Sequence, residues 1–226
     1  MNPMLLAGFL FATLLATADA NTEKTIFVAP PPTTTPDAGP SFDNLNLFSL
    51  SPLQLSLRLP LPVAFPSDEQ PRGIDSWYLL QGLTEAQRYE VRICWAAVQP
   101  TTFCLDVYNI THVFDTPDLI TSLAVYSEAR VRQHLPDTED TVSADKQSVL
   151  FLRVQSAADF FTTNTTLMNS PPDVNVDIIL DPYLANIFPQ SLVPTGGYII
   201  VLAIGSWLLS GIIWKRLFSG PKQHVD

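Results

Sequence analysis

The chain has 226 residues, enough for one ordinary domain or two small ones, and 46% of them are hydrophobic, which excludes a chain disordered throughout. Aspartate and glutamate outnumber lysine and arginine by 22 to 12, giving a formal net charge of -10. Nucleic acid is therefore not expected as a partner, because its phosphates attract basic surfaces.

An apolar run at residues 4–15 opens the chain and leads into Ala18-Asp19-Ala20, small residues of the kind that flank a cleavage site. We therefore expect a signal peptide at residues 1–20 and a mature N-terminus at Asn21. The alternative is an uncleaved anchor, although the run is shorter than the ~20 residues that a membrane span needs.

Strand patterns follow the signal. A short strand is expected at 24–30, followed by an extended connection at 30–40 that is rich in proline and threonine. Residues 45–61 alternate between leucines and polar side chains, as in a strand with one buried face. Three further strands are expected at 77–80, 89–95 and 103–108. Together these segments predict a β-sandwich at residues 21–115.

A corner motif supports the sandwich. The segment Leu80-Gln81-Gly82-Leu83, followed by Tyr89-Glu90-Val91-Arg92-Ile93, resembles the E-to-F corner of fibronectin type III domains, where a tyrosine closes back on the preceding turn. Tyr89 is the expected corner residue. The motif bears on the fold and carries no information on activity.

The segment 116–194 has weaker signals. Thr116-Pro117-Asp118 can cap a helix that runs through Leu123 and Tyr126, and strands are expected at 148–154 and 174–180. Residues 137–145 read as an exposed acidic loop. We expect a second β-rich region packed on the first sandwich, so the predicted fold class is mainly β with one C-terminal transmembrane helix.

The predicted membrane span covers residues 197–214, which carry no charge and are followed by Lys215 and Arg216. Its helix would be about 27 Å long at 1.5 Å per residue. The basic pair places the tail, 215–226, in the cytosol and the N-terminal part in the lumen, as in a type I single-pass protein. A GPI-anchor signal is the alternative, but such a signal ends in its apolar tail.

Small residues mark one side of the predicted span. Ser206 and Ser210, with Gly205 and Gly211 beside them, form a small-xxx-small face on which another helix could pack closely. Small residues are also common in membrane spans generally, so the face has two readings.

Two cysteines, Cys94 and Cys104, lie on consecutive predicted strands and would face each other in a hairpin centred near Gln99. A disulfide is the expected state in an oxidising lumen, and two buried thiols are the alternative. Two N-glycosylation sequons, at Asn109 and Asn164, lie on the predicted luminal side.

Candidate groups for chemistry are few. The histidines, His112, His134 and His224, are far apart in sequence, and no nucleotide or nucleophile motif is present, so no catalytic residue, metal ligand or cofactor site is predicted. The carboxylate pairs Asp115/Asp118 and Glu139/Asp140 read as solvated loops. Five aromatic residues could form either a binding face for sugar or lipid or the sandwich core, and core is the preferred interpretation: Trp77, Tyr78, Tyr89, Trp95 and Phe103.

The mature chain starts Asn21-Thr22-Glu23-Lys24-Thr25-Ile26-Phe27, its centre reads Tyr78-Leu79-Leu80-Gln81-Gly82-Leu83 and Tyr89-Glu90-Val91-Arg92-Ile93-Cys94-Trp95-Ala96, and one span closes it. In this order the parts resemble a fungal family, the co-activators of GPI mannosyltransferase II. The resemblance covers the whole chain loosely.

The resemblance implies a noncatalytic subunit in the endoplasmic reticulum membrane. Its partner would be the multispanning catalytic subunit that adds the second mannose to the GPI precursor, contacted within the bilayer through Ser206 and Ser210. Two other classes stay open: a single-pass luminal binding module, such as a cargo or adhesion-type receptor, and a luminal glycan-modifying enzyme.

Overall fold

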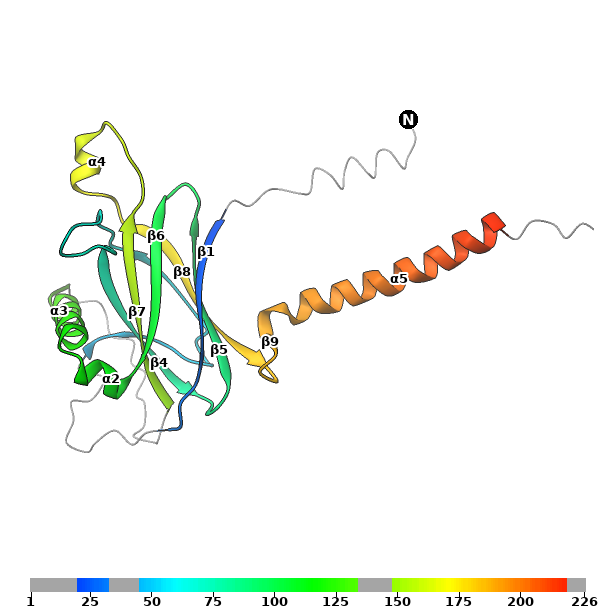
Figure 1. Ribbon diagram of the computed structural model, residues 1–226, viewed down its shortest axis with the longest axis horizontal. Helices are drawn as coiled ribbons and strands as arrows, with labels where there is room; N and C mark the ends of the chain where they lie inside the picture. Colours follow the sequence, from blue (N-terminus) through cyan, green and yellow to red (C-terminus); the bar gives the residue numbers. More distant parts are fainter. Residues whose placement is uncertain (1–19, 33–44, 134–147, 219–226) are drawn as a thin grey trace, which may run out of the picture.

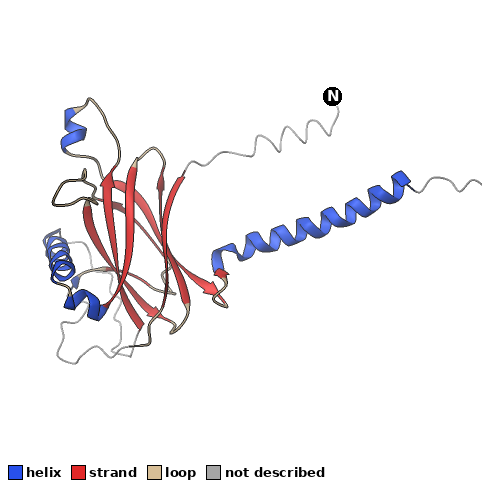
Figure 2. Ribbon diagram, viewed as in Figure 1, coloured by secondary structure: helices blue, strands red, loops and turns tan. Residues whose placement is uncertain are grey.

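The structure, a computed structural model, describes residues 20–32, 45–133 and 148–218. The predicted signal peptide up to residue 19, most of the proline-rich connection and the acidic loop at 137–145 lie outside the described residues. What is described is a β-sandwich with a long C-terminal helix, so the predicted mainly-β fold class is confirmed (Figures 1 and 2).

Two sheets make the sandwich. The first, called the β5 sheet, has the order β1 (Ala20–Val28), β5 (Arg88–Ala96), β8 (Val174–Leu184) and β3 (Ser56–Leu61), with β9 (Phe188–Pro189) paired to β8. The second, called the β7 sheet, has the order β2 (Phe48–Leu50), β4 (Ile74–Leu83), β7 (Ser148–Ala158) and β6 (Thr101–Asn109). Neighbouring strands are antiparallel except β2 and β4, which are parallel.

The core lies between the sheets and follows the two-residue period of the strands. On β5, Tyr89, Val91 and Ile93 are fully buried in it, while the residues between them point to the outer face of the sheet. The same alternation on β8 buries Val176 and Ile178 against them. Burial of these apolar side chains is the main stabilising contribution to the sandwich.

The segment 116–194 contributes strands to both sheets. We expected it to pack on the first sandwich as a second region, but β7 lies between β4 and β6, and β8 lies between β5 and β3. Both strands are buried along most of their length, as central strands are, because neighbours cover their two edges. Residues 45–115 therefore do not complete a sandwich without β7 and β8.

Helices cover the outer face of the β7 sheet. α2 (Ile110–Asp115) and α3 (Pro117–Gln133) pack there, on the side of the sandwich away from the C-terminal helix (Figure 1). They bury a second apolar cluster: Trp77, Leu79, Val113, Leu119, Leu123 and Phe151. The predicted helix start near Thr116 is confirmed, and the helix continues to Gln133. A shorter helix, α4 (Thr165–Asn169), lies on the β7–β8 connection.

The predicted tyrosine corner is present. The Tyr89 hydroxyl accepts a hydrogen bond from the backbone N–H of Thr84 at 3.0 Å and donates one to Oε1 of Gln87 at 3.0 Å. Tyr89 itself is buried in the core. The corner thus fixes the turn between β4 and β5 to the sheet, as the sequence motif indicated.

A 3₁₀ turn, η2 (Gln190–Leu192), leads into α5 (Val193–Phe218). Among the described residues one helical stretch, Gln190–Phe218, is long and apolar enough to cross a membrane. It contains the predicted span 197–214, and it extends away from the sandwich with all its side chains exposed (Figure 2).

Candidate functional site

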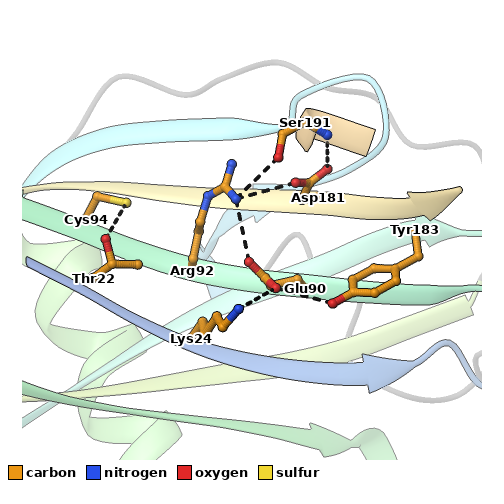
Figure 3. Close-up of polar contacts among 8 residues, drawn as sticks. All are labelled: Thr22, Lys24, Glu90, Arg92, Cys94, Asp181, Tyr183 and Ser191. Atoms are coloured by element: carbon orange, nitrogen blue, oxygen red, sulfur yellow. Dashed lines mark hydrogen bonds and ion pairs between the residues drawn. The ribbon is translucent and has the colours of Figure 1, made fainter. Parts of the chain in front are cut away.

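A group of polar side chains connects the outer face of the β5 sheet to the residues before α5 (Figure 3). We call it the α5-proximal cluster. Lys24 comes from β1, Glu90 and Arg92 from β5, Asp181 and Tyr183 from β8, and Ser191 from η2. The strand register brings these side chains together, because Arg92 lies opposite Lys24 and Glu90 lies opposite Asp181.

Arg92 is the centre of the cluster. Its Nη1 atom lies 3.6 Å from Oε1 of Glu90, 3.5 Å from Oδ2 of Asp181 and 3.4 Å from Oγ of Ser191. The backbone N–H of Ser191 in turn donates to Oδ1 of Asp181 at 3.2 Å. One guanidinium group therefore joins two strands of the sheet to the segment that enters α5.

The two carboxylates are unusually buried for an outer sheet face. Glu90 is 2% exposed and Asp181 is 4% exposed. A carboxylate without partners is costly at such burial, but Arg92 and Lys24 balance the two charges, and Lys24 Nζ lies 3.2 Å from Oε2 of Glu90. The Tyr183 hydroxyl donates to the same oxygen at 3.4 Å. Burial and the Glu90 carboxylate both raise the pKa of Tyr183.

The charges of this cluster are engaged with one another. Such an arrangement orients the chain rather than supplying an acid, base or nucleophile to a substrate, since catalytic groups need an accessible reacting atom. Its effect is to hold residues 190–192 against the sheet, so that α5 leaves the sandwich in a defined direction.

A second polar site lies on the opposite side of the molecule. It is a cleft of about 1060 Å³ between α3, the β7 sheet and residues 69–73. At its floor Asp75 accepts hydrogen bonds from Oγ of Ser122 at 2.5 Å and Nε2 of Gln155 at 2.9 Å, and Arg153 Nε lies 3.2 Å from it. The network ties α3 to the sheet, because Ser122 also accepts from Trp77 Nε1 at 2.9 Å.

The two cysteines do not meet. β5 and β6 belong to different sheets, so the expected hairpin pairing between Cys94 and Cys104 does not occur. Cys94 alternates with core residues on β5, and Cys104 does so on β6, so both side chains point away from the core on opposite faces of the sandwich. Both are free thiols, and Cys94 Sγ accepts a hydrogen bond from Thr22 Oγ1 at 3.5 Å.

Both sequon asparagines lie at the surface. Asn109 is the exposed last residue of β6, next to the first turn of α2. Asn164 is also exposed and caps α4, with its Oδ1 accepting from the backbone N–H of Thr166 at 3.0 Å. Both positions are accessible to a glycan on the folded domain.

The other predicted positions separate into core and surface. All five aromatic residues are buried, which confirms their interpretation as core. Four lie in the cluster between the two sheets, and Trp77 lies in the cluster between the β7 sheet and the helices α2 and α3. His112 is exposed and stacks on Tyr108 at 5.4 Å between ring centroids, whereas His134 and His224 lie outside the described residues. In the described part of the chain, no three His, Cys, Asp or Glu side chains gather as a metal site.

The small-residue face of α5 is open. Ser206 and Ser210 are exposed, and a Cβ added at Gly205 or Gly211 would meet nothing within 4 Å. Within residues 20–32, 45–133 and 148–218, no side chain buries this face, which leaves it accessible there to another helix.

The α5-proximal cluster was missed at the level of sequence. Glu90 and Arg92 alternate with apolar residues on β5, which is the usual pattern of a solvated sheet face. Their burial depends on Asp181 and Ser191, which are brought to them only by strand pairing and by the chain returning over the sheet at η2. No local pattern carries that information.

Comparison with known proteins gives one relevant relative. A protein of Schizosaccharomyces pombe named as a subunit of GPI mannosyltransferase 2 is 25% identical over 180 residues, which make up 80% of this chain and 76% of that protein. No family model and no solved structure matches the chain. The relative confirms the resemblance that the sequence motifs had indicated.

Proposed function

We propose that this chain, as a homologue of that GPI mannosyltransferase 2 subunit, is an accessory subunit in the mannosylation of GPI precursors. The observation that carries the proposal is the extent of the similarity, which takes in four fifths of this chain and three quarters of the relative. A match of this extent is much longer than a single motif.

The finer role that we propose is a noncatalytic co-activator of the step that adds the second mannose. The partner is the multispanning catalytic subunit, and the site of action is the endoplasmic reticulum membrane with the sandwich in the lumen. The paired charges of the α5-proximal cluster support a structural role, because Arg92 and its carboxylates bind one another. The long exposed α5 supports a membrane anchor.

In this mechanism α5 packs on a helix of the catalytic subunit through its Ser206 and Ser210 face, where small side chains allow close backbone approach. The α5-proximal cluster holds the sandwich at a set angle to α5, so that binding in the bilayer also positions the sandwich over the luminal loops of the enzyme. Activation then follows from stabilising one arrangement of those loops.

The decisive experiment is depletion of the protein followed by profiling of GPI precursors. We expect a one-mannose intermediate to accumulate, and expression of the full chain should remove it. An unchanged precursor profile after complete depletion would reject the proposal.

Orientation is tested through the two sequons. We propose that Asn109 and Asn164 carry glycans in the lumen, so Asn109→Gln and Asn164→Gln should each increase electrophoretic mobility, and endoglycosidase treatment should abolish the difference. A single mobility for all forms, before and after treatment, would contradict luminal glycosylation.

A further inference from the structure

The turn between β8 and β9 has a tightly defined backbone. Ala185 and Asn186 have positive φ angles of 50° and 58°, and the backbone N–H of Ile187 donates to the carbonyl of Leu184 at 3.0 Å. Two consecutive positive φ angles closed by this hydrogen bond are typical of an I′-like β-turn, here within the three-residue connection between the paired residues Leu184 and Phe188, and such angles favour asparagine and strain alanine. The turn projects two apolar residues, Leu184 and Ile187, from its ends.

Side-chain hydrogen bonds fix this turn to the rest of the sandwich. Asn186 accepts from the backbone N–H of Arg88 at 2.8 Å through Oδ1 and donates to the carbonyl of Ala86 at 3.0 Å through Nδ2. Gln87 Nε2 donates to the carbonyl of Tyr183 at 3.3 Å. The turn is therefore a rigid projection of the domain, and its exposed side chains cannot fold back into the core.

Apolar side chains are concentrated around this turn. Ile187 is 74% exposed and Leu184 is 48% exposed, and the exposed group continues along the chain with Phe188, Leu192 and Val193 at the start of α5. Arg88 lies beside them, with its guanidinium carbon 5.8 Å from the centroid of the Tyr183 ring. Exposed apolar side chains grouped in one short segment, with a basic residue nearby, are typical of a surface that contacts another phase or partner.

The position of the turn indicates that its apolar side chains contact the lipid interface. The turn lies at the corner of the sandwich from which α5 departs (Figure 1). α5 has 26 residues and so spans about 39 Å, close to the ~40–45 Å of a bilayer with its headgroups, which puts its first turn at headgroup level. Phe188 precedes that first turn by only a few residues, so these apolar side chains lie close in the chain to the start of the helix.

We propose that the β8–β9 turn inserts Leu184 and Ile187 into the headgroup region of the bilayer that α5 crosses, with Arg88 reaching the lipid phosphates. The sandwich then has two attachments to the membrane, the helix and this turn, and these fix its tilt over the surface. The proposal rests on α5 crossing the membrane, which is part of the proposed function.

The test measures the depth of single fluorescent labels in the full chain, reconstituted in phosphatidylcholine vesicles. Cys94 and Cys104 are first replaced by serine, and an environment-sensitive dye is attached through Ile187→Cys or, as a second turn position, Leu184→Cys. Phe161→Cys is the matched control, because Phe161 is apolar and 87% exposed but lies on the β7–β8 connection near α4. Leu208→Cys reports on the middle of α5.

Quenchers are spin-labelled lipids carrying the spin either at the headgroup or deep in the acyl chain. We expect both turn labels to be quenched more by the headgroup spin than by the deep spin, the Leu208→Cys label to show the opposite order, and the Phe161→Cys label to be unaffected. Turn labels as unaffected as the Phe161→Cys label, with the Leu208→Cys label still quenched, would overturn insertion of the turn and leave the span intact. An unquenched Leu208→Cys label would overturn the span and the turn together.

Discussion

Arg92 and Arg58 both lie on the outer face of the β5 sheet beside carboxylates, but their surroundings differ. The Arg58 side chain is 83% exposed and forms a two-pronged pair with Asp177, at 2.6 and 2.8 Å. Arg92 instead lies between two carboxylates that are almost wholly buried. The same residue type therefore has a surface role in one place and a structural role in the other.

Arg92→Met should lower the free energy of unfolding of the sandwich by about 3 kcal/mol, because it leaves the buried Asp181 without a charged partner and Glu90 with Lys24 alone. Arg58→Met is the matched control, and its effect should be much smaller, since exposed ion pairs are screened by water. Urea unfolding followed by tryptophan fluorescence measures both. Equal losses for the two variants would show that the α5-proximal cluster does not contribute more than a surface pair.

Asp177 gives a prediction on pH. Its hydrogen bonds from Arg58 lower the pKa of the carboxyl group below the ordinary value, against a smaller opposing effect of burial. A carboxyl whose pKa is lower in the folded state contributes stability above its unfolded pKa of about 3.9, and this contribution is lost as the pH falls through the folded pKa.

In Arg58→Met the pKa of Asp177 should therefore rise towards its unfolded value. The wild-type chain should lose stability through Asp177 as the pH falls below about 4, and the variant should not show this contribution. Carboxyl chemical shifts followed by NMR across this range measure the pKa directly. An unchanged Asp177 titration in the variant would mean that the pair does not form in solution.

At the scale of elements, the start of β4 depends on a close approach of two backbones. Gly73 has a φ of 78° and lies against β7, where an added Cβ would overlap the carbonyl group of Ser156. Gly82, at the irregular end of the same strand, has a φ of 65°, but its nearest obstacle is Pro52 Cδ at 3.8 Å. Both glycines avoid backbone strain, and only Gly73 also avoids a steric clash.

Gly73→Ala should therefore destabilise the domain by about 1–3 kcal/mol more than Gly82→Ala, because overpacking is added to the conformational cost that the two variants share. Thermal unfolding monitored by circular dichroism compares the two. Similar melting temperatures for both variants would indicate that β4 and β7 can separate locally at this point without loss of the sheet.

At the scale of the whole molecule, α5 presents two surfaces that a partner helix could contact. One is the small-residue face of α5, and the other is the larger apolar side opposite it, with Leu208 at its centre by helical geometry. Ser191 of η2 is bound to the sandwich by the α5-proximal cluster, so we expect a contact made along α5 to act on the sandwich through η2.

Replacing Ser206 and Ser210 together by leucine should reduce recovery of the proposed partner, the catalytic subunit, when this chain is purified in mild detergent, because bulky side chains prevent close helix approach. Leu208→Phe is the control, since it adds bulk on the opposite side of α5. Equal recovery with the serine variant and the wild-type chain, or equal loss with both variants, would reject the assigned packing face.

Local patterns in the chain are sufficient for several features of this protein. The Tyr89 corner and the apolar helix at 197–214 each depend on residues close in sequence, and the structure contains both. The alternating segment 45–61 is only partly a strand, because it divides into β2 and β3 of different sheets and leaves Leu53 fully exposed between them. The two-residue period of a strand places residues 90, 92 and 94 on one face of β5. Only the tertiary structure decided what that face meets, because strand pairing is non-local and parity does not specify the neighbour. It placed β5 and β6 in different sheets, which separates Cys94 from Cys104. It also brought Asp181 and Ser191 next to Arg92, so that the polar face of β5 binds the segment that leads into the C-terminal helix.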